Sequence, residues 1–202
     1  MKGFVLAGSL LASIFIASTA QAAMGGALTT EEAATLTPNS FAWQDTGEAG
    51  DIRIVVSIAD QRAYVYRNST LIAMSTVSTG REGKETPIGV YPILQKNKDH
   101  KSNLYNAAPM PYMQRLTWDG IAIHAGRNPG FPASHGCIRV PKAFAVKLFS
   151  VTQIGTTVEV TDEPVGEGYQ PADNLVPADV MASASAETSH ANAAQLVSYT
   201  PR

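Results

Sequence analysis

The stretch Ser134-His135-Gly136-Cys137-Ile138-Arg139-Val140 contains the single cysteine of the 202-residue chain. A second histidine, His124, lies thirteen residues upstream of the cysteine, in Ile121-Ala122-Ile123-His124-Ala125-Gly126. A thiol attacks as thiolate, and a nearby imidazole is the usual group that generates one near neutral pH. Gly136 allows a tight turn, and the amides of Gly136 and Cys137 are placed to bind an oxyanion. This pattern predicts a cysteine acyltransferase site.

Two other interpretations of the motif were weighed. A lone cysteine is often a small buried hydrophobe. His124, His135 and Cys137 also supply three potential zinc ligands, the number that catalytic zinc sites use. Neither interpretation explains why a glycine, two histidines and Arg139 surround the thiol, and no fourth Cys or acidic ligand lies near these residues in the sequence. A catalytic thiol is therefore the favoured interpretation.

The N-terminus has the features of an export signal. Met1-Lys2 gives a small positive region, Phe4 to Ser18 is apolar, and Ala20-Gln21-Ala22 is an A-x-A cleavage site. Residues 1–22 are therefore predicted to be a signal peptide, with a retained anchor as the alternative, and the protein is expected in the periplasm or cell wall. A single cysteine cannot form an intramolecular disulfide in such an oxidising compartment, which again favours a functional thiol.

Charge divides the remaining chain into three parts. Residues 23–50 contain four acidic residues and no Lys or Arg, and are predicted to be a flexible acidic segment. Residues 163–202 form an Ala/Ser/Pro-rich tail, predicted to be disordered because it has few large apolar groups. The intervening residues 51–162 carry thirteen Lys or Arg against eight Asp or Glu, a net charge of +5. This balance suits an anionic substrate or an ordinary solvated surface, and no nucleic-acid partner is predicted.

The central part of the chain has mainly β patterning. Apolar residues alternate with others from Ile52 to Ala59, which predicts a half-buried strand. Residues 95–112 are predicted to be a long functional loop. Phe144, Leu148 and Val151 recur at helical spacing and predict one short helix that begins at Pro141. The other predicted strands are 62–67, 71–79, 90–94, 157–160 and a hairpin of 114–118 with 121–124 that turns at Asp119-Gly120.

The motif Ser134-His135-Gly136-Cys137-x-Arg139, with Ile123-His124-Ala125-Gly126 upstream, resembles the L,D-transpeptidase catalytic domain of YkuD type. The resemblance covers about residues 51 to 161 and includes further segments in the same order. These segments are Ile54-Val55-Val56, Ser78-Thr79-Gly80, Thr86-Pro87-Ile88-Gly89, Pro109-Met110-Pro111-Tyr112 and Gly155-Thr156-Thr157-Val158.

The resemblance implies a mainly β fold, a YkuD-like β-sandwich of mixed sheets with one short helix after the nucleophile motif. It implies action on peptidoglycan tetrapeptide stems, with cleavage between the third residue and the terminal D-Ala. Transfer of the acyl group to an amine would form 3→3 crosslinks or attach an acceptor protein to the wall, in the service of cell wall organization and cell shape. Transfer to water would make an L,D-carboxypeptidase, and a non-catalytic wall-binding module is the remaining alternative. No metal or organic cofactor is implied.

The resemblance also assigns roles by position. Cys137 is the expected nucleophile and His124 the expected base, with the carbonyl of Ala125 or Gly126 fixing its tautomer. Ser134, His135, Gly136 and Arg139 occupy the supporting positions. Arg139, Tyr112 and Trp118 are candidates for substrate contact, against a structural role for the arginine and burial in the core for the two aromatic residues.

Overall fold

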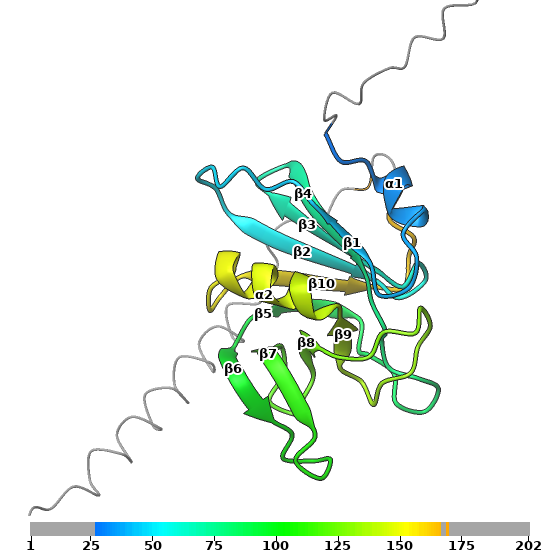
Figure 1. Cartoon of the computed structure of the whole chain (residues 1–202). Coiled ribbons are helices and arrows are strands. Elements are labelled where there is room, and N and C mark those ends of the chain that lie inside the picture. Colours follow the sequence, from blue (N-terminus) through cyan, green and yellow to red (C-terminus); the bar gives the residue numbers. More distant parts are fainter. Residues whose placement is uncertain (1–26, 167–168, 170–202) are drawn as a thin grey trace, which may run out of the picture.

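The computed structural model describes residues 27–166 and residue 169, which form two β-sheets and two helices (Figure 1). The larger sheet, sheet A, has six strands in the order β1-β4-β3-β2-β10-β5, in which β2 and β10 are parallel and the other pairs antiparallel. Their bounds are β1 Phe41–Trp43, β2 Ile52–Ser57, β3 Arg62–Arg67, β4 Thr70–Thr76, β5 Gly89–Pro92 and β10 Thr157–Thr161.

The smaller sheet, sheet B, has the order β6-β7-β8-β9. Its strands are β6 Gln95–Lys101, β7 Pro109–Arg115, β8 Ala122–Ala125 and β9 Ile138–Val140. The β6-β7 and β7-β8 pairs are antiparallel, whereas β8 and β9 are parallel. The fold is therefore mainly β with two mixed sheets, which confirms the expected fold class.

The main core lies between the two sheets and under helix α2, Lys142–Val151. Ile54 and Val56 of sheet A meet Ile123 and Ile138 of sheet B in this core, which Phe144 of the helix completes. Figure 1 shows α2 lying across the junction of the sheets. The helix follows the nucleophile motif as predicted, although Pro141 precedes it as the N-cap and is not its first residue.

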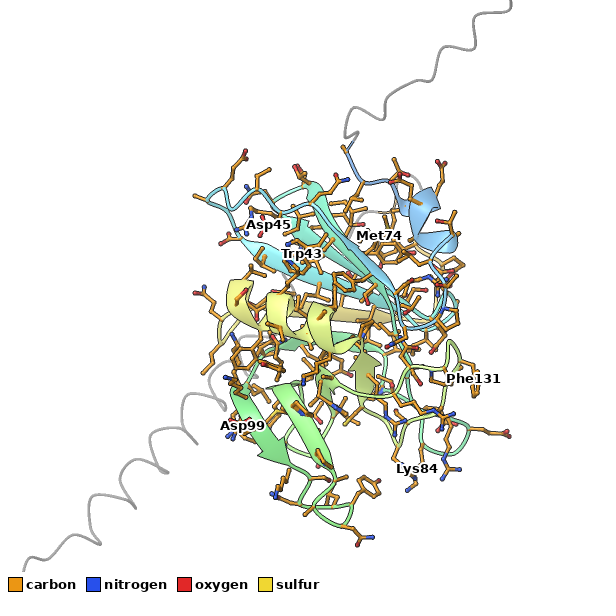
Figure 2. All side chains as sticks on the ribbon, in the orientation of Figure 1. Trp43, Asp45, Met74, Lys84, Asp99 and Phe131 are labelled. Atoms are coloured by element: carbon orange, nitrogen blue, oxygen red, sulfur yellow. The ribbon has the colours of Figure 1, made fainter. Side chains whose placement is uncertain are left out.

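The second face of sheet A is also covered. Val55, Tyr64 and Met74 point into a smaller core that contains Leu28 and Ala33. Strand β2 is therefore buried on both faces, which corrects the expectation of a half-buried strand. In Figure 2, Met74 lies on the side of α1 and Trp43 on the side of α2.

The N-terminal segment is ordered from residue 27, so the prediction of a flexible segment over residues 23–50 is wrong there. Helix α1, Thr30–Ala34, begins with a capping box in which Thr29 and Glu32 exchange side-chain and backbone hydrogen bonds. The Arg62 guanidinium then donates to the carbonyls of Ala33 and Leu36, which fixes the end of this helix on sheet A. Strand β1 follows and pairs with β4.

The beginning of the C-terminal segment also packs on sheet A. Val165 is buried in the smaller core, and its amide donates to the Asp60 carboxylate at 2.8 Å. The Tyr169 hydroxyl donates to Glu159 at 2.9 Å. The predicted boundary at residue 162 is therefore too early, and the rest of the predicted tail lies outside the described residues.

Residues 95–112 are not the long loop that was predicted. Strands β6 and β7 pair over most of this stretch, and only residues 102–108 connect them. The Lys96 ammonium donates to the carbonyls of Phe149 and Thr152, so the hairpin is held to the end of α2. None of the helices within the described residues is both long and apolar enough to cross a membrane. The predicted signal peptide lies outside those residues.

Candidate active site

Strands β8 and β9 place the predicted nucleophile and base on one face of sheet B. Ile123 and Ala125 of β8 point into the main core, so His124 between them points to the opposite face. The parallel register pairs His124 with Arg139 and Ile123 with Ile138, which puts Cys137 one position before the paired residues. The alternation of side chains along these strands therefore directs His124 and Cys137 to the same face of sheet B, away from the core.

His124 is buried, and its Nδ1 lies 2.8 Å from the carbonyl oxygen of Ala125. Because a carbonyl can only accept, Nδ1 carries the proton and Nε2 is left as the acceptor. Burial is the main effect on the imidazole and lowers its pKa; the hydrogen bond to Ala125 opposes this effect, and the Arg139 and His100 charges add to it. The imidazole is therefore a neutral base at neutral pH.

The Cys137 thiol is half-buried, and its Sγ donates to the Gly120 carbonyl at 3.3 Å. Burial raises the pKa of this thiol and outweighs the opposing effects of the Ala122 amide and the Arg139 and Arg115 charges. Burial therefore favours the neutral thiol beside a neutral imidazole in the resting site.

The turn before Cys137 is fixed by hydrogen bonds. The Ser134 hydroxyl donates to the Cys137 carbonyl at 2.5 Å and accepts from the Gly136 amide at 3.1 Å. Gly136 has φ +112°, and a Cβ there would come within 2.7 Å of Ile121 Cδ1. A larger residue at position 136 would therefore be strained and would displace the turn.

These bonds change the expected oxyanion site. The Gly136 amide is already engaged by Ser134, so it is not a free donor as the motif suggested. The Cys137 amide has no acceptor within the part of the chain that the structure describes. It is therefore the donor that remains available to a developing oxyanion beside the sulfur.

Cys137 and His124 both line a cavity of about 800 Å³ on this face of sheet B. Arg139 and Trp118 also line it, and so do Ser134, His135 and Gly126. Tyr112 does not, because its ring packs edge-on against Phe149 of α2, with the ring centroids 5.8 Å apart. The structure thus brings together the predicted substrate contacts at 118 and 139 but separates Tyr112 from them.

His135 lines the cavity and is exposed. Its ring stacks at 4.8 Å on Tyr105, and its Nε2 lies 3.3 Å from the Arg81 guanidinium. In the ranges 27–166 and 169, no three or more His, Cys, Asp and Glu side chains are grouped so that they could hold a metal ion.

The β6-β7 hairpin contributes cavity residues that the sequence did not single out, among them His100, Tyr105 and Met110. Within β7, the φ of Tyr112, +56°, interrupts the alternation of side chains. Met110 and Met113 consequently pack in the same small cluster beside Cys137. A non-glycine residue in this conformation is uncommon and is often found near functional sites.

The sequence profile of the L,D-transpeptidase catalytic domain (YkuD) matches residues 51–160. The probable L,D-transpeptidase YbiS of Escherichia coli K12 is 27% identical over 164 residues, which cover 66% of this chain and 51% of that protein. The chain therefore spans about half the length of the curated relatives it matches.

Solved structures show the same fold. An L,D-transpeptidase (Yku) from Stackebrandtia nassauensis has a TM-score of 0.54 at 23% identity, covering 68% of this chain and 66% of its own. The Ldtfm-avibactam carbamoyl enzyme has a TM-score of 0.52 at 25% identity, covering 57% of this chain and 50% of its own.

Proposed function

Because the chain belongs to the L,D-transpeptidase catalytic domain (YkuD) family, we propose that it is an exported cysteine acyltransferase acting on peptidoglycan stem peptides. The observation that carries the proposal is that the parallel pairing of β8 with β9 places Cys137 and His124 on one face of sheet B, where both line one cavity. His124 is held by Ala125 so that Nε2 is its accepting nitrogen.

In the proposed reaction, His124 Nε2 removes the proton of the Cys137 thiol as Sγ attacks the carbonyl before the terminal D-Ala. The Cys137 amide donates to the oxygen that becomes negative. The C–N bond then breaks, and the departing amine takes the proton from His124. A thioester remains on Cys137 until an amine attacks it, which forms a 3→3 crosslink or attaches an acceptor protein to the wall.

Proton transfer from a neutral thiol to a neutral imidazole suits the buried setting of the pair. No ion pair has to be maintained away from water while the site is empty, and charge develops only as the sulfur attacks. Arg139 and Arg115 act electrostatically on the Cys137 thiol in the direction that favours its ionised form. They therefore stabilise the charge on sulfur when it forms.

The test combines product analysis with covalent capture. The full chain is incubated with a purified tetrapeptide stem, with and without an added amine. Crosslinked or amine-coupled products support the transferase, tripeptide alone indicates the L,D-carboxypeptidase, and no reaction on any stem leaves the wall-binding module. The Cys137→Ala variant is the control for each product.

A carbapenem provides an independent readout of the thioester. Its strained amide acylates a thiol, and its amine leaving group stays tethered after the ring opens, so the acyl-enzyme persists. The similar Ldtfm protein has been captured as a carbamoyl enzyme with avibactam, a related acylation. Intact mass is expected to show one carbapenem on the wild type and none on Cys137→Ala. An adduct that survives the substitution contradicts the assignment of the nucleophile.

A further inference from the structure

The cavity beside Cys137 contains positive groups without acidic partners. Arg115, Arg127 and Arg139 line it together with His100, and the only acidic side chain among its lining residues is Asp119. Within residues 27–166 and 169, none of these three arginines lies within ion-pairing distance of a carboxylate. The cavity therefore presents positive charge that a bound anion would neutralise.

Arg115 differs from Arg139 in how it is held. One Nη of Arg139 donates to the Ala133 carbonyl at 3.3 Å, and its aliphatic part lies against Gly126. Arg115 is held through its Nε, which donates to the Gln95 side chain at 2.9 Å, and its guanidinium lies 5.7 Å from the Trp118 ring centroid. Both Nη groups of Arg115 lack an acceptor among the described residues and remain available to a ligand.

The strand register places Arg115 opposite the nucleophile. Arg115 pairs with Ala122, and the parallel register of the next two strands sets Cys137 beside Ala122. Adjacent strands are about 4.8 Å apart, so the two main chains are separated by roughly 10 Å along this row. Ala122, with its short side chain, is the residue between them in this row, and a long arginine side chain can reach a group close to the reacting carbonyl.

We propose that Arg115, assisted by His100, binds the free α-carboxylate of the residue that is released from the donor stem. This proposal rests on the proposed function and names a specificity-determining residue for it. The departing nitrogen must lie at His124 to receive its proton, and the α-carboxylate is two bonds from that nitrogen. Arg115 and His100 line the same cavity as His124, so they border the place where the carboxylate would lie.

A carboxylate on the acyl side would bind differently. The side-chain carboxylate of a diamino acid in the third position is several bonds from the reacting carbonyl and on the side of the thioester. The row from Arg115 to Cys137 is too short for that group. Arg115 instead offers two adjacent donors to a nearby carboxylate, the geometry of a bidentate charge-assisted pair. Such recognition restricts cleavage to the peptide bond before the last residue of a stem.

The experiment compares two donors that differ in one group: a tetrapeptide with a free terminal carboxylate, and the same peptide as the carboxamide. The wild-type full chain is expected to have a kcat/KM roughly 10- to 100-fold higher for the acid, the usual effect of losing a hydrogen-bonded charge. In Arg115→Gln the ratio is expected to fall close to one, mainly through the loss of acid turnover. Arg115→Lys keeps the charge without the paired donors and is expected to lie between the two.

Arg127→Gln is the matched control. It removes the same charge from the same cavity, but Arg127 lies after β8 and outside the row that contains Arg115. The control is expected to retain the preference for the acid. The melting temperature and alkylation by neutral iodoacetamide show whether each variant is folded with an accessible thiol.

The failures of the two proposals are distinguishable. Equal turnover of acid and carboxamide by the wild type overturns the role of Arg115 but leaves the acyltransferase intact. A folded Arg115→Gln variant that loses turnover of the acid and of the carboxamide by the same factor also overturns it. The arginine would then act only on the structure or on the thiol. A wild-type chain that cleaves neither donor overturns the acyltransferase and this inference together.

Discussion

Trp43→Ala tests whether the N-terminal segment is part of the folded domain, although the family match begins only at residue 51. Trp43 of β1 is half-buried, its ring centroid lies 5.7 Å from that of Phe144, and Lys147 Nζ lies 5.6 Å from it. Truncating a fully buried tryptophan costs about 3–5 kcal/mol. Partial burial reduces this loss, and the aromatic pair contributes about 0.5–1.5 kcal/mol, so we expect destabilisation of about 2–3 kcal/mol.

The assay is urea unfolding monitored by circular dichroism, with thermal unfolding as a second measurement. At roughly 2–4 °C per kcal/mol, the melting temperature of Trp43→Ala should fall by about 4–12 °C. Ile154→Ala is the matched control, because Ile154 is 67% exposed and its loss should change the free energy of unfolding by less than about 0.5 kcal/mol. If Trp43→Ala is as stable as this control, β1 does not stabilise the domain and the reasoning fails.

Other expectations concern the site and the C-terminal segment. Alkylation of Cys137 should accelerate only as the pH rises above about 8.5, and a rate already on its plateau at neutral pH would indicate a thiolate at rest. His124→Ala should lower tetrapeptide turnover by on the order of 10²–10⁴-fold, and near-normal turnover would exclude it as the base. Burial lowers the pKa of His124, so the unfolded chain takes up a proton at this residue before the folded chain does as the pH falls through about 6.5. The melting temperature should therefore drop from pH 7 to pH 5 more steeply in the wild type than in His124→Gln. Deleting residues 163–202 should lower the melting temperature more than deleting 170–202, because only the longer deletion removes Val165 and Tyr169, and equal values would contradict their packing.

Strong local patterns in the sequence predicted the central elements. Alternation identified β2, and the spacing of Phe144 and Leu148 identified α2. The burial of β2 on both faces was missed because the residues that cover its second face, such as Leu28 and Val165, come from both ends of the domain. No local pattern reports such contacts.

Strand β6 was missed for a different reason. All seven of its residues are polar or charged, with no apolar alternation, and only Lys96 and His100 among them are partly buried. As an edge strand it pairs only with β7, so main-chain hydrogen bonds define it rather than a buried face. The kink at Tyr112 has no signature in the sequence either, because tyrosine gives no indication of a positive φ.

In the site, too, the residues within a local motif were predicted, whereas the features that depend on folding were not. The motif indicated Cys137 and His124, and the structure places both in one cavity. The ionisation of the thiol and the engagement of the Gly136 amide depend on burial and on Ser134, which only the folded chain reveals. Arg115 lies outside the motif, and its relation to Cys137 comes from strand register alone.

The parallel pairing of β8 and β9 has a consequence for how such an enzyme can diversify. His124 lies in β8 and Cys137 directly before β9, and the other faces of these two strands pack in the core, so the main chain sets the spacing of the two residues. The groups that meet the rest of a substrate come largely from the β6-β7 hairpin and the loops around the cavity. Mutations in the hairpin and loops can therefore change which molecules enter the cavity without changing the spacing between His124 and Cys137.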